Sequence, residues 1–268
     1  MDLARVTHGW DSLRFTGAWV FSTSQLTPAQ SQGQTAVVKI DQQGANHLVS
    51  LIAAQRQGRA ADVSGSDAPF LGAFAQFTPD DAWLVYAEWG SSRQQYALTP
   101  GATSTPPLYT VQQNPPRTQT ALTGASYTFE NGQTLTGEYL HASGGYSRAG
   151  EQQYFSQAAA ANTLALTNAS LGYGALGQAL GYAPRLLGRD YVWLGWQSNP
   201  QETKLYWRAE YTANLQDGSG QALLYVEKNF VPRLTGFLAL TRTFGGAATE
   251  YGALVRTRLT VGVKFFAF

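Results

Sequence analysis

The chain has 268 residues, of which only 13% are charged, while 44% are hydrophobic and 13% are aromatic. The formal net charge of +1, with no block of like charges, argues against nucleic-acid binding. The absence of cysteine excludes disulfides, thiolate catalysis and cysteine-ligated metal sites. The three histidines, His8, His47 and His141, lack metal-ligand spacing, so we expect neither a metal nor another cofactor.

The apolar residues are numerous but dispersed. The charged share is about half that of a usual soluble protein, which indicates a large apolar exterior. The sequence contains no apolar run of roughly 18 residues, so a membrane-spanning form of this chain requires strands. Met1 is the only methionine and no signal peptide precedes Asp2, so we expect Met1 to stand where an export signal was removed.

Segments of period-2 alternation, closed by turn residues, predict an all-β chain of about twelve strands, with a range of roughly 10–14. We expect one domain over residues 1–268, a transmembrane antiparallel up-and-down β-barrel. The expected strands are 12–22, 35–43, 48–57, 70–77, 82–92, 119–129, 134–143, 190–197, 204–214, 221–229, 235–243 and 252–268.

Every second connection between these strands is short and rich in turn residues such as Asn-Gly and Pro-Asp. The intervening connections are mostly longer, notably 93–118 and 144–189. Short periplasmic turns that alternate with long extracellular loops are typical of outer-membrane barrels. An even strand number would leave both chain ends on the periplasmic side.

Alternation within the strands supports a lipid-facing side and a polar side. In 82–92, Trp83, Val85 and Trp89 share one face, whereas Tyr86 and Glu88 share the other. The strands 134–143, 204–214 and 252–268 alternate acceptably or well. Four others, 48–57, 70–77, 119–129 and 235–243, alternate less cleanly, and their faces stay unassigned.

The long connection 144–189 contains an alanine-rich stretch, 152–161, that favours a helix. This helix could cap or plug a pore. Alternatively it is an exposed loop helix without a gating role.

The last segment, Leu259 to Phe268, resembles the closing strand of Gram-negative outer-membrane β-barrel proteins, which typically end in phenylalanine. The resemblance implies that Phe268 is a signal for the barrel-assembly machinery. Phe268 has the same parity as Lys264, whereas the alternating apolar residues Val261, Val263 and Phe265 have the other parity. A bulge near Phe265 and Phe266 or an extra terminal residue is therefore expected. Twelve-stranded members of this class include narrow channels, a lipase and autotransporter translocators.

The function expected first is that of a monomeric, porin-like channel in the bacterial outer membrane, in contact with outer-membrane lipid and lipopolysaccharide. It would pass ions or an unidentified small solute through a narrow lumen of mixed charge. Ionisable side chains would point into that lumen, because charge is costly against lipid. Alternatively, many of them pair across strands and brace the wall. The candidates are Arg14, Lys39, Asp41, Glu88, Glu138, Arg208, Glu210, Arg256, Arg258 and Lys264.

Three other functions stay open. His141 and Ser143 lie two apart near a loop, which is similar to the His-x-Ser arrangement of outer-membrane phospholipases and lipid A deacylases. Here glycine rather than asparagine follows the serine, and no orienting acid is evident in the sequence, so we do not expect an enzyme. The chain could also be the translocation barrel of a larger export protein, although no helical segment precedes the first expected strand. A soluble β-protein that binds sugars through its tryptophans is disfavoured by the alternation of loop lengths.

Overall fold

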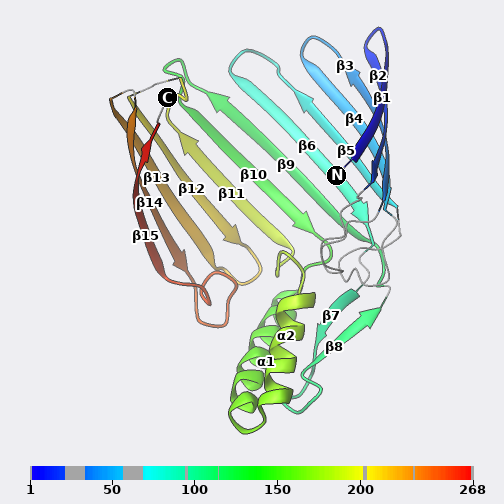
Figure 1. The fold of residues 1–268 in the computed structure, drawn as a ribbon, viewed down its shortest axis with the longest axis vertical. Coiled ribbons are helices and arrows are strands. Elements are labelled where there is room, and N and C mark those ends of the chain that lie inside the picture. Colours follow the sequence, from blue (N-terminus) through cyan, green and yellow to red (C-terminus); the bar gives the residue numbers. More distant parts are fainter. Residues whose placement is uncertain are drawn as a thin grey trace.

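The protein is described by a computed structural model that covers residues 2–21, 34–56, 69–93, 96–113, 115–201, 204–231 and 233–266. Its main element is one antiparallel sheet of thirteen strands, each paired with its neighbour in chain order (Figure 1). The strands are β1 (Asp2–Trp10), β2 (Leu13–Phe21), β3 (Thr35–Gln43), β4 (His47–Arg56), β5 (Phe70–Phe77), β6 (Trp83–Ser92), β9 (Thr118–Thr128), β10 (Thr134–Ala142), β11 (Asp190–Gln197), β12 (Leu205–Asn214), β13 (Gly220–Val231), β14 (Leu234–Phe244) and β15 (Thr257–Phe265).

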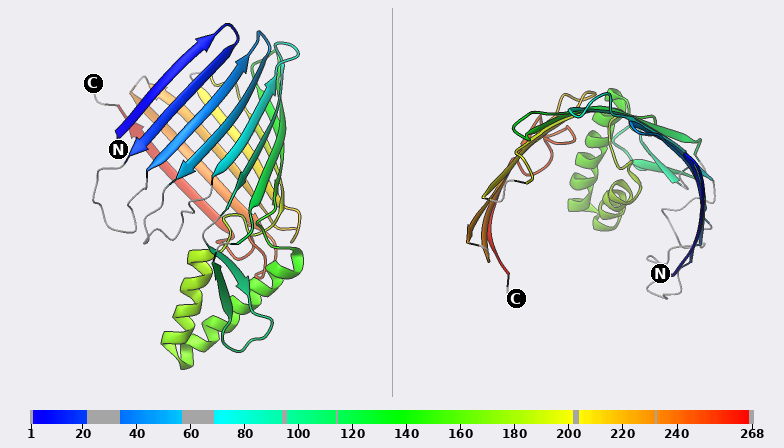
Figure 2. Two further views of the ribbon diagram at one scale, coloured as in Figure 1. Left: turned by 90° about the vertical axis from the view of Figure 1, so that its right-hand side faces the viewer. Right: turned by 90° about the horizontal axis from the view of Figure 1, so that it is seen from above.

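The sheet curls into a trough that is not closed (Figure 2). Among the described residues, β1 pairs only with β2, and β15 pairs only with β14, so these two strands are the free edges. Twelve successive antiparallel pairings give β1 and β15 the same direction. An odd strand number therefore places Asp2 and Phe265 at opposite ends of the sheet. The expectation that both chain ends lie on one side is wrong for this reason.

The estimate of about twelve strands is too low. All twelve expected segments form sheet strands, but β1 precedes them, and β7 (Tyr96–Pro100) and β8 (Tyr109–Gln113) form a separate hairpin. The sequence of β1 mixes polar and apolar residues on both faces, so it lacks the alternation by which strands are recognised. The five-residue strands β7 and β8 lie in the Pro-rich connection, where prolines point to loops.

The last strand, β15, is shorter than expected and regular. It begins at Thr257 rather than at residue 252 and pairs with β14 without a register shift up to Phe265. The expected bulge near Phe265 is therefore not found in the described residues. Phe268, the expected assembly signal, lies outside them.

The connections differ in length at the two ends of the sheet. One end carries short turns, such as 11–12, 44–46 and 129–133. The other end carries 93–117, 143–189 and 245–256, with one exception, the five-residue connection 215–219. This exception is a tight turn, because Asn214 N donates to Ser219 O at 2.9 Å and Gly218 takes a positive φ of 72°.

The two longest connections fold together into a small body that we call the cap. It consists of the β7–β8 hairpin, α1 (Arg148–Thr167) and α2 (Ala169–Tyr182), and it lies beyond the long-connection end, on the concave side of the sheet (Figures 1 and 2). Ser147 caps α1 by accepting a hydrogen bond from Gly150 N, and Asn168 caps α2. No helix in the described part of the chain combines the length and hydropathy needed to cross a membrane.

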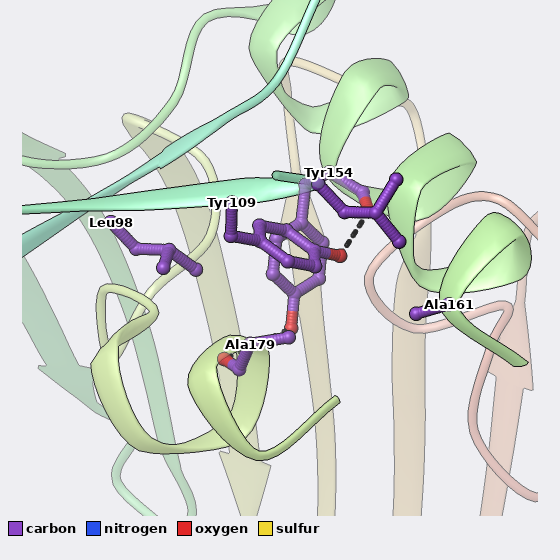
Figure 3. Close-up of a cluster of buried hydrophobic side chains, with 6 residues drawn as sticks. Leu98, Tyr109, Tyr154, Ala161 and Ala179 are labelled. Carbon is purple, nitrogen blue, oxygen red and sulfur yellow. Dashed lines mark hydrogen bonds between the residues drawn. The ribbon is translucent and has the colours of Figure 1, made fainter. Parts of the chain in front are cut away.

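The cap has a conventional hydrophobic core between its helices and its hairpin (Figure 3). Tyr109 donates a hydrogen bond to Tyr154 O at 2.8 Å, and Tyr146 donates to Leu98 O at 2.8 Å. The buried members are Leu98, Leu108, Tyr109, Tyr154, Ala161 and Ala179. The cap is thus a packed unit that joins two connections.

Candidate functional site

The strand register assigns every strand residue to one of two faces of the sheet. Directly paired residues point to the same side, so one row of partners identifies one face throughout the sheet. Such a row runs without interruption from β2 to β12 and consists of Arg14, Asp41, Ser50, Phe74, Glu88, Leu122, Leu140, Tyr191 and Asn214.

This face is the concave one. Asn214 Nδ2 donates a hydrogen bond of 2.7 Å to Glu151 Oε1 on α1. The cap helices lie on the inner side of the curve when the trough is viewed along its length (Figure 2). A side chain that reaches α1 from the sheet therefore points inward, and so do the others of its row.

Nine of the ten candidate pore residues lie on sheet strands, and all nine are on the concave face. The tenth, Arg256, lies in the connection just before β15. The structure therefore brings the candidates together on one surface, while their role in lining a pore stays a prediction.

Several of these charges are paired with each other. Lys39 Nζ lies 2.7 Å from Asp41 Oδ1, and Ser50 donates to the same carboxylate oxygen. On β12, Arg208 Nε lies 2.9 Å from Glu210 Oε1. Both ion pairs join residues two apart on one strand, rather than on neighbouring strands, and they leave the face with both signs of charge.

Sequence reasoning missed Tyr225 and Glu227, which form a second polar group on this face with the predicted Lys264. Lys264 Nζ lies 2.6 Å from Glu227 Oε2, and Tyr225 donates to the same oxygen. Tyr86 also donates to Glu138 across β9. Period 2 in β13 could have revealed Tyr225 and Glu227, since they alternate with Leu224 and Val226.

The opposite, convex face is mainly apolar, with its charged residues Asp190, Lys228 and Arg242 near strand ends. Its exposed side chains include Val38, Leu51, Val85, Leu194 and Val261. Two groups of aromatic residues lie near its ends. Trp83, Tyr127, Phe129, Trp196 and Trp207 form contacts near the short turns, and Tyr211 contacts Phe244 near the long connections. An apolar band between aromatic groups suits a lipid bilayer with two interfaces.

A buried polar cluster, which we call the latch, joins the cap to the concave wall. Asn214 Nδ2 donates to Glu151 Oε1 and, at 2.9 Å, to Glu250 Oε2. Tyr191 donates to the same Glu250 oxygen at 2.6 Å, and Glu250 N donates to Asp217 Oδ2 at 2.7 Å. A Cβ atom on Gly188 would lie 2.6 Å from Asn214 Oδ1 and 2.8 Å from Glu151 Oε1, so a larger residue there would displace these side chains.

Glu151 is the least exposed of the three carboxylic acids of the latch, with 1% of the residue exposed. Its pKa is raised to about 7, chiefly by burial and also by the charges of Asp217 and Glu250, although the hydrogen bond from Asn214 acts to lower it. Its Oε2 atom has no hydrogen-bond partner among the described residues. A proton on Glu151 would relieve repulsion among the three carboxylates, so the latch favours the neutral acid.

His141 and Ser143, the candidate catalytic pair, are not hydrogen-bonded to each other. His141 Nδ1 lies 2.8 Å from Asp190 Oδ1, and Tyr139 donates to that oxygen at 2.6 Å. Ser143 Oγ accepts from Gln119 N at 2.8 Å. An acid that orients the histidine is thus present, although the sequence did not reveal it, but the serine is held by the backbone. In the described residues, no group of three or more His, Cys, Asp or Glu could hold a metal ion.

Comparison with known proteins gives structural matches only. Neither a protein-family model nor a curated protein matches the chain. OccK10 (OpdN) of Pseudomonas aeruginosa matches with a TM-score of 0.53 and 8% identity, over 98% of this chain and 71% of that one. A triple mutant of Rhodopseudomonas blastica porin matches with a TM-score of 0.49 and 12% identity, over 98% of this chain and 76% of that one. OmpT, an outer membrane protein of Vibrio cholerae, matches with a TM-score of 0.46 and 11% identity, over 98% of this chain and 88% of that one.

These neighbours are outer-membrane β-barrel proteins. At identities this low the likeness concerns the fold alone, and the OccK10 match carries it. The predicted resemblance is confirmed at that level, and the expected location in a bacterial outer membrane agrees with it. The chain has the fold of bacterial outer-membrane β-barrel proteins, without a match to one particular family among them.

Proposed function

We propose that the protein is an outer-membrane channel that passes ions or small solutes through a narrow lumen of mixed charge. One observation carries the proposal. Most charged side chains of the sheet lie on its concave face, while the convex face is mainly apolar and bears two aromatic groups. The convex charges Asp190, Lys228 and Arg242 lie near the ends of their strands. A membrane protein needs this arrangement when it encloses water, because a lumen solvates charge and lipid does not.

In the membrane the sheet closes by parallel pairing of β1 with β15. The free edges would otherwise leave rows of backbone N–H and C=O groups in hydrocarbon, where each unsatisfied group costs several kcal/mol, on the order of 3 or more. Both strands run from the long-connection end to the short-turn end, which makes the closing pair parallel.

The short turns face the periplasm, and the long connections with the cap face the outside. This orientation puts the cap over the outer mouth, where it restricts access. We place the protein in the membrane as a monomer, surrounded by outer-membrane lipid and lipopolysaccharide and inserted by the barrel-assembly machinery.

Conductance in planar bilayers tests the channel. Reconstituted protein should give discrete current steps, and Glu210→Lys should shift the reversal potential in a salt gradient toward anion selectivity, since a lumen carboxylate becomes a cation. Lys228→Gln serves as the control, because it removes a charge from the convex face at the short-turn end of β13. This variant should leave the reversal potential unchanged. Repeated silence of correctly folded protein would count against an open channel.

Cysteine scanning tests the closure. We would introduce one cysteine at Val6 and a second at successive positions of β15, from Thr260 to Val263. Since the chain contains no cysteine of its own, any disulfide must form between the introduced residues. Closure predicts an intramolecular disulfide at one register. Disulfides formed only between two chains would contradict a monomeric closed barrel.

Lipid hydrolysis is the competing activity, and it has a direct assay. Ester release from phospholipid vesicles that disappears in Ser143→Ala would establish an esterase. We expect no such release, because the Ser143 hydroxyl is bound to Gln119 N rather than to His141.

A further inference from the structure

The concave wall contains an apolar hollow within its polar surface. It lies on β3 to β6 and β9, strands that are neighbours in the sheet (Figure 1). The cavity measures about 540 Å³, which is within the usual range for sites of small organic ligands. The apolar residues of its lining that have the concave parity of their strands are Leu48, Ile52, Phe70, Phe74 and Leu122.

Two glycines make room for the hollow. Gly72 and Gly90 are direct partners on β5 and β6. A Cβ atom on Gly72 would lie 2.8 Å from Ile52 Cγ2, and one on Gly90 would lie 3.2 Å from Phe70 Cε2. The absence of both side chains therefore lets Phe70 lie against the wall, and larger residues would fill the space above it.

The hollow explains an irregularity in the sequence. Leu48, Ile52, Phe70, Phe74 and Leu122 belong to the segments 48–57, 70–77 and 119–129, three of the four whose alternation is unclear. Their alternation fails because apolar residues stand on both faces there. Local departures from the expected pattern of a fold tend to mark functional sites.

The charges at the hollow do not balance. Lys39 and Glu88 are its two charged lining residues. Lys39 is neutralised by Asp41 at 2.7 Å, whereas Glu88 forms no hydrogen bond or ion pair with another described residue. Glu88 is also exposed to the concave side. The uncompensated charge is therefore negative.

Glu88 stands beside an aromatic ring. Its direct partner across the β5–β6 ladder is Phe74, so the two Cβ atoms are about 5 Å apart. An ammonium group placed there can contact the carboxylate and the ring together, and both attract a cation. The apolar residues around them would cover a hydrophobic body attached to that ammonium.

We propose that this hollow is a binding site for small organic amines, cations with an apolar body of about the size of a phenyl group. This proposal rests on the proposed function in one respect, that the concave face of the sheet is in contact with water. A solute that binds here would pause on its way through the lumen.

Calorimetry on folded protein in detergent tests the site without requiring conductance. We use 2-phenylethylamine as the probe, with 2-phenylethanol as its neutral analogue and 3-phenylpropionate as its anionic analogue. The amine should bind at least about tenfold more tightly than either analogue, as expected for a charge-assisted contact. Equal affinity for the amine and the alcohol would overturn the proposal.

Variants locate the site. Glu88→Gln should weaken amine binding about tenfold and leave the alcohol unchanged, while Glu210→Gln, a lumen carboxylate outside the hollow, should change neither. Phe74→Leu keeps an apolar side chain but removes the ring, and should weaken amine binding severalfold. Unchanged amine affinity in Glu88→Gln would refute the site. Binding without current steps would leave the site standing and count against the channel.

Discussion

The sheet and the cap place their apolar side chains in opposite ways. In the cap, Leu108, Tyr109 and Ala161 are nearly inaccessible, and six of the seven buried apolar residues of the described chain belong to it. In the sheet, large apolar side chains are exposed, and Val261 on β15 is 68% exposed. The cap excludes water from a core of its own, whereas the sheet offers its apolar side to the surroundings.

This difference indicates that the cap suits an aqueous environment, whereas the convex face of the sheet suits lipid. The cap is held together by burial and by hydrogen bonds within it, as in a soluble domain. The sheet is held by its backbone ladder and needs lipid against its outer face. The latch, which includes Glu151, Asn214 and Glu250, lies at the boundary between the two parts.

The largest effect is expected from Tyr109→Ala in the cap. Tyr109 is 2% exposed, and removing a buried aromatic side chain costs about 3–5 kcal/mol. Hydrogen-exchange mass spectrometry should show α1 and α2 losing protection while β9 to β15 keep theirs. Loss of protection throughout the sheet would show that the two parts do not unfold separately.

The cost of an introduced arginine in folding free energy should depend on the face of the sheet that carries it. Leu224→Arg places a charge on the convex face of β13 and should cost about 2–4 kcal/mol of folding free energy in lipid. Its neighbour Leu223 lies on the concave face opposite Glu210, so Leu223→Arg should cost less than about 1 kcal/mol. Unfolding in guanidinium, followed in lipid vesicles, measures both. Equal costs would contradict the assignment of the faces.

The latch should respond to pH. The pKa of Glu151 is about 7 in the folded protein and 4.5 without burial, so the docked cap binds the proton more tightly. Docking should be strongest below about pH 4.5, weaken as pH rises, and lose on the order of 3 kcal/mol by pH values above 7. Exchange of α1 amides, corrected for intrinsic rates, reports the docking.

Glu151→Gln is the control for this response. It keeps a neutral side chain that can accept from Asn214, and the pH dependence between 4.5 and 7 should flatten. A wild-type cap whose exchange does not change over this range would show that the latch carboxyl does not control docking.

The smallest effect is expected from Tyr109→Phe. This change removes the hydrogen bond to Tyr154 O and keeps the ring, so the cap should lose about 0.5–1.5 kcal/mol. The difference from Tyr109→Ala separates the hydrogen bond from packing. A loss as large as that of Tyr109→Ala would mean that the hydroxyl, rather than burial, holds the core.

Most sheet strands could be predicted from the sequence because a period of two is a local property. Trp83, Val85 and Trp89 mark the convex face of β6 without knowledge of any other strand. The same reasoning failed for β1, and it left the faces of β14 and of β4, β5 and β9 unassigned. In β4, β5 and β9, Leu48, Phe74 and Leu122 place apolar side chains on the concave face, where they line the hollow.

The sequence by itself determined the outward apolar pattern, the alternation of connection lengths and the charged residues that share a face within each strand. Only the tertiary structure decided how faces on different strands combine, because that depends on register and curvature. It places Phe74 beside Glu88 and joins Glu151 to Asn214, 63 residues away in the chain. Contacts over such separations form through the folding of whole connections, and no local periodicity encodes them.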